Sequence, residues 1–151
     1  MSKRSETRSS SPQPFAPVHA VTAIAREFER VSRESPLSMT QYRLLLYLRD
    51  GPRSVSEIAA INLITKATTS GHLNAIRENK WVYAEIEPLD RRVTRIVLTE
   101  SGLEALAQFE TSLLDCLKVL VAEEDRTRVL ADLTSLYTSM GAAREARNAE
   151  A

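Results

Sequence analysis

Two groups of residues in the middle of the chain have the types and spacing needed to bind nucleic acid. Lys66 falls in the first turn of a predicted helix. Free backbone N–H groups and the positive end of the helix dipole also attract phosphate there. Arg91, Arg92 and Arg95 lie at or beside the tip of a predicted hairpin. An arginine on a narrow hairpin can enter a minor groove, whose potential is negative. These residues therefore predict that the chain binds duplex DNA through its negative charge.

The predicted helix after Thr65 presents an outward face of small and only partly polar residues. The residues of this face are Ala67, Ser70, Gly71, Asn74 and Glu78. Asn74 could pair with the edge of an adenine, and Thr68 or Ser70 could bond to a base or a phosphate. No arginine is available on this face to recognise guanine, so phosphates and the hairpin should supply much of the affinity. The alternative is that a bare face lets the helix lie unusually deep in the groove.

The elements that must position these residues begin with two helices. Ser54 and Glu57 form a capping box, which marks the start of the first helix. Thr65 is the predicted N-cap of the second helix, which carries apolar residues at helical spacing. We expect Asn79 to adopt the left-handed conformation that ends this second helix.

A hairpin follows, because the spacing of apolar residues then changes from helical to alternating. Residues 82–87 and 93–98 alternate on either side of a turn at 88–91, which predicts two paired strands. A helix pair followed by a hairpin is a winged helix. Its second helix could enter a major groove while the hairpin reaches an adjacent minor groove.

These segments resemble the MarR family of winged-helix transcription regulators over roughly residues 37 to 140. Besides the helix pair, the matching motifs are Leu37-Ser38-x-x-Gln41, Asp90-x-Arg92 and Ile96-x-Leu98-Thr99-Glu100-x-Gly102. The resemblance implies a helical dimer with a wing that binds pseudo-palindromic double-stranded DNA and is often released by a small ligand or by oxidation. It also implies that Asp90 orients the wing arginine through a salt bridge, and that Arg92 enters the minor groove.

The chain departs from the family pattern at two positions. The family usually has an arginine where Gly71 stands and a glycine where Lys80 stands. A glycine inside a helix costs about 1 kcal/mol relative to alanine. At residue 71 it also removes a side chain that could contact a base or a phosphate.

The fold class expected is mainly α with a small β-wing. The helix after Ser38 is apolar on nearly all sides and should be buried at the centre. Three long amphipathic helices outside the winged helix exceed what one small domain can cover, and burial in a homodimer is the simplest solution. The predicted regions are a flexible tail at 1–17, an N-terminal dimerisation helix at 18–36, the winged helix-turn-helix at 37–99, C-terminal dimerisation helices at 100–141 and a frayed tail at 142–151.

The N-terminal tail is rich in serine and proline, and we expect Pro12, Pro14 and Pro17 to prevent a helix there. A flexible tail is the simpler interpretation. The alternative is a basic arm that touches DNA. The basic residues of such an arm are Lys3, Arg4 and Arg8.

Composition narrows the class of protein further. The 151 residues include 20 Lys and Arg against 20 Asp and Glu, so charge alone gives only weak support for DNA binding. The single cysteine fits a reducing, cytoplasmic location. No apolar run approaches the roughly 20 residues that span a membrane. No catalytic triad, paired catalytic carboxylates, phosphate-binding loop or metal-ligand cluster occurs, so neither an enzyme nor a cofactor is predicted.

Five residues are candidates for a ligand pocket between the DNA-binding and dimerisation regions. They are His19, Arg26, Tyr42, Arg43 and Tyr47. An arginine or histidine could pair with a carboxylate while tyrosines line a ring. The other interpretation is ordinary packing and surface. The resulting hypothesis is a repressor released from its operator by a small organic ligand, either an aromatic or a carboxylate compound.

Two alternatives to a ligand-released repressor stay open. Cys116 lies among leucines, which is typical of a small core residue. A redox-responsive regulator would instead need this thiol to be exposed and its pKa lowered. The other alternative is a winged helix used as a protein-interaction module without DNA binding.

Overall fold

The computed structural model describes residues 14–149 and is mainly helical with one small antiparallel sheet, which confirms the predicted fold class. The elements in chain order are α1 (Ala16–Arg33), α2 (Met39–Leu48), β1 (Arg53–Ser54), α3 (Val55–Asn62), α4 (Lys66–Glu78), β2 (Val82–Ile86), β3 (Thr94–Leu98), α5 (Glu100–Leu120), the 3-10 helix η1 (Glu123–Asp125) and α6 (Arg126–Ala149). The proposed basic arm and the last two residues lie outside the described part of the chain.

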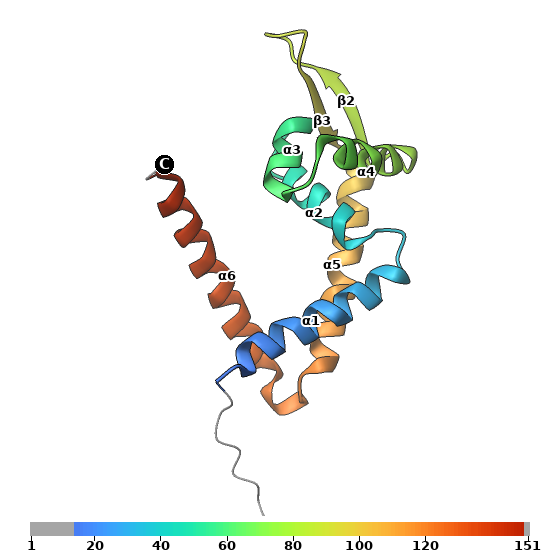
Figure 1. Cartoon of the computed structure of the whole chain (residues 1–151). Coiled ribbons are helices and arrows are strands. Elements are labelled where there is room, and N and C mark those ends of the chain that lie inside the picture. The colour runs from blue at the N-terminus through green and yellow to red at the C-terminus, as the bar shows by residue number, and fades with distance from the viewer. Residues whose placement is uncertain (1–13, 150–151) are drawn as a thin grey trace, which may run out of the picture.

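The winged helix occupies one end of the molecule and the long helices the other (Figure 1). The hairpin of β2 and β3 projects beyond α3 and α4. α5 leads away from this lobe, crosses α1, and is followed by η1 at the far end. From there α6 turns back along the other side. In the described residues, no helix is both long enough and apolar enough to cross a lipid bilayer.

Side-chain caps fix where the helices of the winged helix begin. Ser38 and Ser54 each form the complete capping box that the sequence predicts, with Gln41 and Glu57 as their partners. Thr65 Oγ1 accepts a hydrogen bond of 3.1 Å from the backbone N–H of Thr68, which confirms Thr65 as the N-cap of α4. These caps satisfy backbone donors that the first helical turn leaves free.

The first helix begins at Ala16, within the segment predicted to be tail. Pro17 lies in its first turn and does not prevent the helix, so that part of the sequence prediction was wrong. A proline there loses no hydrogen bond, because the N–H groups of a first turn have no helical partner.

The residue that ends α4 in the left-handed conformation is Lys80, with a φ of 60°. The prediction of Asn79 for this role was wrong, since Asn79 has a φ of −78°. The N–H groups of Lys80 and Trp81 reach back to the carbonyls of Arg77 (2.8 Å) and Ile76 (3.2 Å). This pair of bonds requires a left-handed residue at the position of Lys80. Glycine suits it best, and the MarR-like pattern has glycine there.

The end of α4 is tied to the start of α5. The carbonyl oxygen of Lys80 accepts hydrogen bonds from the hydroxyls of Thr99 (2.8 Å) and Ser101 (3.1 Å). The N–H of Thr99 donates to the carbonyl of Trp81 at 3.0 Å. At Gly102, a Cβ would collide with this same Trp81 carbonyl, so the close approach requires glycine.

The wing contains a third strand that the sequence analysis did not predict. The strand order is β1-β3-β2, and β1 pairs Arg53 with Ile96 and Ser54 with Arg95. β2 and β3 pair along their whole length, from Val82 opposite Leu98 outward. Only Val82 of β2 is buried, so the outer hairpin is a two-stranded ribbon in solvent.

The core joins the winged helix to the long helices around α2. Three leucines of α2 are buried, which confirms its predicted central position; they are Leu44, Leu45 and Leu48. Thr69, Leu73 and Ile76 of α4 also face this core and have at most 2% of their surface exposed. This packing fixes the rotation of α4 about its axis, and therefore which of its residues face solvent.

Candidate nucleic-acid interface

The outward face of α4 carries the polar residues predicted to meet DNA. Lys66, Ser70 and Asn74 are exposed, because the opposite face of α4 is buried. Thr68 is also exposed, and its hydroxyl lies 2.9 Å from that of the cap residue Thr65. The exposed face thus combines one cation at the helix N-terminus with short hydrogen-bonding groups along one stripe.

Arg77 belongs to the same stripe and was missed by the sequence analysis. It is exposed, and it follows Ser70 and Asn74 at positions i+7 and i+3. Residues at such spacings lie on one side of a helix. Arg77 and Asn74 also line one shallow hollow together with Glu78. The expectation that this face holds no arginine was therefore wrong, and the helical spacing could have corrected it.

Gly71 leaves an open notch in the middle of this face. A Cβ built at residue 71 meets no atom within 4 Å, so packing within the chain does not require glycine there. The notch brings the α4 backbone closer to whatever faces it. This observation supports the alternative in which α4 lies deep in a groove.

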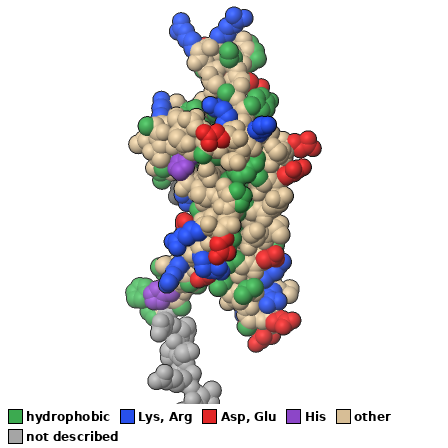
Figure 2. Space-filling view, turned by 90° about the vertical axis from the view of Figure 1, so that its right-hand side faces the viewer, with side chains coloured by type: hydrophobic (Ala, Val, Ile, Leu, Met, Phe, Trp, Pro, Cys, Tyr) green, Lys and Arg blue, Asp and Glu red, His purple; other side chains and the backbone are tan. Residues whose placement is uncertain are grey.

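The wing tip presents two exposed arginines, Arg91 and Arg92. Figure 2 shows basic side chains projecting from the end of the hairpin. The Asp90 carboxylate accepts a hydrogen bond of 3.0 Å from the backbone N–H of Arg92. Within residues 14–149 no ion pair joins Asp90 to an arginine, so the predicted salt bridge is replaced by this backbone contact. Asp90 thereby fixes the turn from which Arg92 projects.

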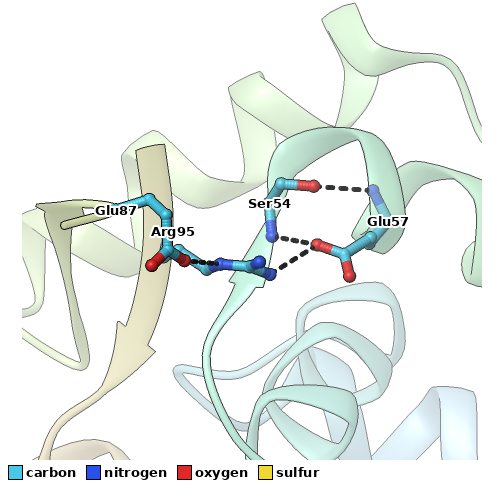
Figure 3. A network of polar contacts seen from close by, with 4 residues as sticks. All are labelled: Ser54, Glu57, Glu87 and Arg95. Carbon is cyan, nitrogen blue, oxygen red and sulfur yellow. Dashed lines mark hydrogen bonds and ion pairs between the residues drawn. The ribbon is translucent and has the colours of Figure 1, made fainter. Parts of the chain in front are cut away.

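Arg95 lies nearer the base of the wing and is held by two carboxylates (Figure 3). Its Nε lies 2.8 Å from Glu87 Oε2, and its Nη1 lies 3.0 Å from Glu57 Oε2. The bond to Glu87 raises the pKa of the Arg95 guanidinium. Hydrogen bonds from Ser54 lower the pKa of Glu57. Arg95 was predicted to touch DNA, yet its guanidinium is engaged within the protein.

Comparison with known proteins agrees with this geometry. Residues 35–93 match a model of the MarR family. An uncharacterised HTH-type transcriptional regulator of Bacillus subtilis, YpoP, is 27% identical over 95 residues, which are 58% of this chain and 67% of that protein. Both matches support a DNA-binding transcriptional regulator of the MarR type.

Solved structures of MarR-type proteins share this fold. MepR of Staphylococcus aureus, a regulator of the multidrug efflux pump MepA, superimposes with a TM-score of 0.65 and 20% identity over 83% of this chain and 96% of its own. Sco3205 of Streptomyces coelicolor, a MarR family regulator solved in complex with DNA, has a TM-score of 0.59 and 22% identity over 81% of each chain. CouR, a transcriptional repressor bound to a DNA duplex, has a TM-score of 0.60 and 24% identity over 82% of this chain and 90% of its own.

The five residues predicted to form a ligand pocket lie in different surroundings. His19, Arg26 and Arg43 are exposed. The Tyr42 hydroxyl lies 3.4 Å from the Glu110 carboxylate, and burial is the main cause that raises the pKa of Tyr42. Tyr47 instead packs under the Arg53 guanidinium, which lies 5.0 Å from the centre of its ring.

A hollow of about 550 Å³ lies elsewhere, between the end of α1, the start of α5 and Trp81. It is lined by Val31, Glu34, Ser35, Pro36, Leu37, Trp81, Ser101, Glu104, Ala105, Gln108, Phe109 and Ser112. None of the five predicted ligand residues is among them. The two glutamates would repel a carboxylate compound and attract a cation.

Cys116 is half-buried on α5, and Arg30 of α1 is close enough to interact with it electrostatically. Arg30 is distant from Cys116 in the sequence, so this proximity could not be read from the sequence alone. In the described residues, no group of three or more histidine, cysteine, aspartate or glutamate side chains could hold a metal ion.

Proposed function

We propose that this chain is a homodimeric repressor that clamps pseudo-palindromic duplex DNA. In each half of the dimer, α4 enters a major groove and the wing reaches the adjacent minor groove. The observation that carries the proposal is that one lobe exposes both the polar stripe of α4 and an arginine-tipped wing. Such a pair of projections matches the alternation of grooves along one face of a duplex.

Exposed apolar side chains on the long helices support the dimer. They occur at the start of α1, at the end of α5 and along α6. The most exposed are Phe15, Val18, Val21, Val119, Leu120, Leu136, Tyr137 and Met140. Soluble monomers rarely expose apolar patches of this extent, and a second copy would bury them in a two-fold interface.

The decisive experiment is selection of bound duplexes from random DNA, together with sedimentation of the protein alone and in complex. We expect two inverted half-sites whose centres lie about 34 Å apart, bound by two chains. A monomer that recovers a single half-site would contradict the clamp. Failure to retain any duplex at low salt would favour a protein-interaction module instead.

We further propose that a small organic ligand releases the protein from DNA. Ligand binding at the boundary between the lobes would change the separation of the two α4 helices and break the match to the half-sites. Aromatic carboxylates and lipophilic cations of similar size should be compared in a DNA-release assay. Release by carboxylates supports the sequence-based ligand class. Release by cations alone would point to the hollow that contains Glu34 and Glu104.

A further inference from the structure

One ion-pair network connects the wing to the helix-turn-helix. Arg95 of β3 contacts Glu87, which directly follows β2, and Glu57, in the first turn of α3 (Figure 3). Glu57 lies 38 positions from Arg95 in the sequence. The network therefore joins both strands of the wing to a helix that belongs to the folded core.

The anchor at Glu57 is itself rigid. Its Oε2 atom accepts a hydrogen bond of 2.7 Å from the backbone N–H of Ser54 and also pairs with Arg95 at 3.0 Å. The capping box holds the Glu57 side chain independently of its contact with Arg95. A single carboxylate oxygen thus caps α3 and holds the wing.

Arg95 lies at the last position along the hairpin where β1 supports the other two strands. Ser54 of β1 pairs with Arg95, and no register partner from β1 lies farther toward the tip. Beyond that point the wing has only the pairing between β2 and β3. Two-stranded ribbons are marginally stable by themselves and bend easily. The direction of the ribbon is therefore set at Arg95.

We propose that Arg95 is a positioning residue for DNA binding, which holds the wing at the angle from which Arg92 reaches the minor groove. The proposal rests on the proposed function. The Arg95 side chain has 30% of its surface exposed and both of its guanidinium contacts are internal, so it acts through the wing. Partly exposed ion pairs add little to folding stability. The effect of Arg95 should appear in DNA affinity rather than in thermal stability.

The test is a double-mutant cycle between Arg95 and Arg92, with affinity for a selected duplex as the measured quantity. If Arg95 positions Arg92, R95Q weakens binding about three- to tenfold in the wild-type background and has no effect in the R92A background. Equal losses in both backgrounds would overturn the proposal, because they would show that Arg95 contacts DNA independently.

Two further variants separate charge from geometry. R95K keeps the charge but lacks the planar fork that contacts both carboxylates, so it should lose affinity as R95Q does. The pair E57Q/E87Q retains a capping side chain at residue 57 and removes both negative charges that pair with Arg95. Positioning predicts weaker binding for this pair. A direct contact between Arg95 and DNA predicts stronger binding, since two competing carboxylates are removed.

The outcome for the wild-type protein distinguishes this inference from the proposed function. If the wild type binds no duplex, the proposed function itself fails. If the wild type binds and R92A weakens it, the cycle tests the positioning role alone. Unchanged melting temperatures in all variants would show that the affinity differences do not come from unfolding.

Discussion

Arg92 is held differently from its neighbour at the wing tip, although both side chains are exposed. The backbone N–H of Arg92 donates to Asp90, and the N–H of Val93 donates to the Asp90 carbonyl at 2.9 Å. These bonds close a tight turn around Asp90. Of the two arginines, Arg92 therefore has the more firmly held backbone, which suits the proposed insertion of its side chain into a minor groove.

We expect Arg92→Ala to lower affinity for the selected duplex by about 1–3 kcal/mol, because it removes a groove contact. A gel-shift titration at fixed salt measures this loss. Arg33→Ala is the matched control, since Arg33 is an exposed arginine at the end of α1. Wild-type affinity in the Arg92 variant would reject the wing mechanism.

Gly71→Ala should stabilise the protein by about 1 kcal/mol, because alanine is the better helix former and residue 71 has open space. Denaturant unfolding measures the gain. The DNA affinity of the same variant is a second readout. Unchanged affinity would show that α4 stays clear of the groove floor, whereas a loss would show that the helix lies deep in the groove.

Site residues differ in how far the sequence alone could place them. The stripe of Ser70, Asn74 and Arg77 follows from helical spacing, so the omission of Arg77 was avoidable. The ion pair between Arg95 and Glu57 was not predictable in this way. Glu57 is brought to Arg95 only when β1 pairs with β3, which is a contact between distant segments.

Two helix ends in the winged helix carry a left-handed residue that is not glycine. Leu63, after α3, has a φ of 54°, and Lys80, after α4, has a φ of 60°. Leu63 is 93% exposed, so its side chain gains little from packing. Each position therefore has a conformational cost that the surrounding backbone hydrogen bonds offset.

Leu63→Gly and Lys80→Gly should each raise the free energy of unfolding by up to about 1 kcal/mol, the relief of strain less the added freedom of the unfolded chain. Asn79→Gly is the control, because Asn79 has a negative φ and should give no gain. Urea unfolding of the three variants tests the assignment. A gain for Asn79→Gly alone would place the left-handed residue elsewhere.

Local and long-range signals explain which elements the sequence could predict. The capping boxes at Ser38 and Ser54 depend on residues three apart, and both were predictable. β1 has two residues and exists only through pairing with β3, so it has no periodic pattern of its own. The end of α4 was mispredicted because backbone bonds to Arg77 and Ile76, and not side-chain preference, choose the left-handed residue.

At the scale of the whole molecule, zero net charge conceals an uneven distribution. Arg91 and Arg92 gather positive charge at the wing tip, whereas acidic and basic side chains are mixed on the long helices, where Arg128 pairs with Asp125 (Figure 2). Such a local concentration of positive charge favours the approach of a polyanion while the total charge stays neutral. The composition could not reveal this, because it holds no spatial information.

The dimer predicts a link between assembly and DNA affinity. Tyr137→Asp on α6 should weaken dimerisation, because it places a charge within an exposed apolar group. DNA binding should weaken with it and recover at higher protein concentration, as mass action requires. Sedimentation and gel-shift titrations over the same concentration range check this. A variant that is monomeric yet binds with full affinity would contradict the clamp.

The hydroxyl contacts that Thr99 and Ser101 make with Lys80 have a mechanical consequence. They tie the C-terminal end of α4 to the N-terminal end of α5, a helix of 21 residues. At the helical rise of 1.5 Å per residue, α5 is about 32 Å long. A tilt of about 5° about its far end therefore moves the junction with α4 by about 3 Å. In the proposed dimer, a small rotation at the far end of α5 would therefore become a larger displacement of α4 at the bound DNA.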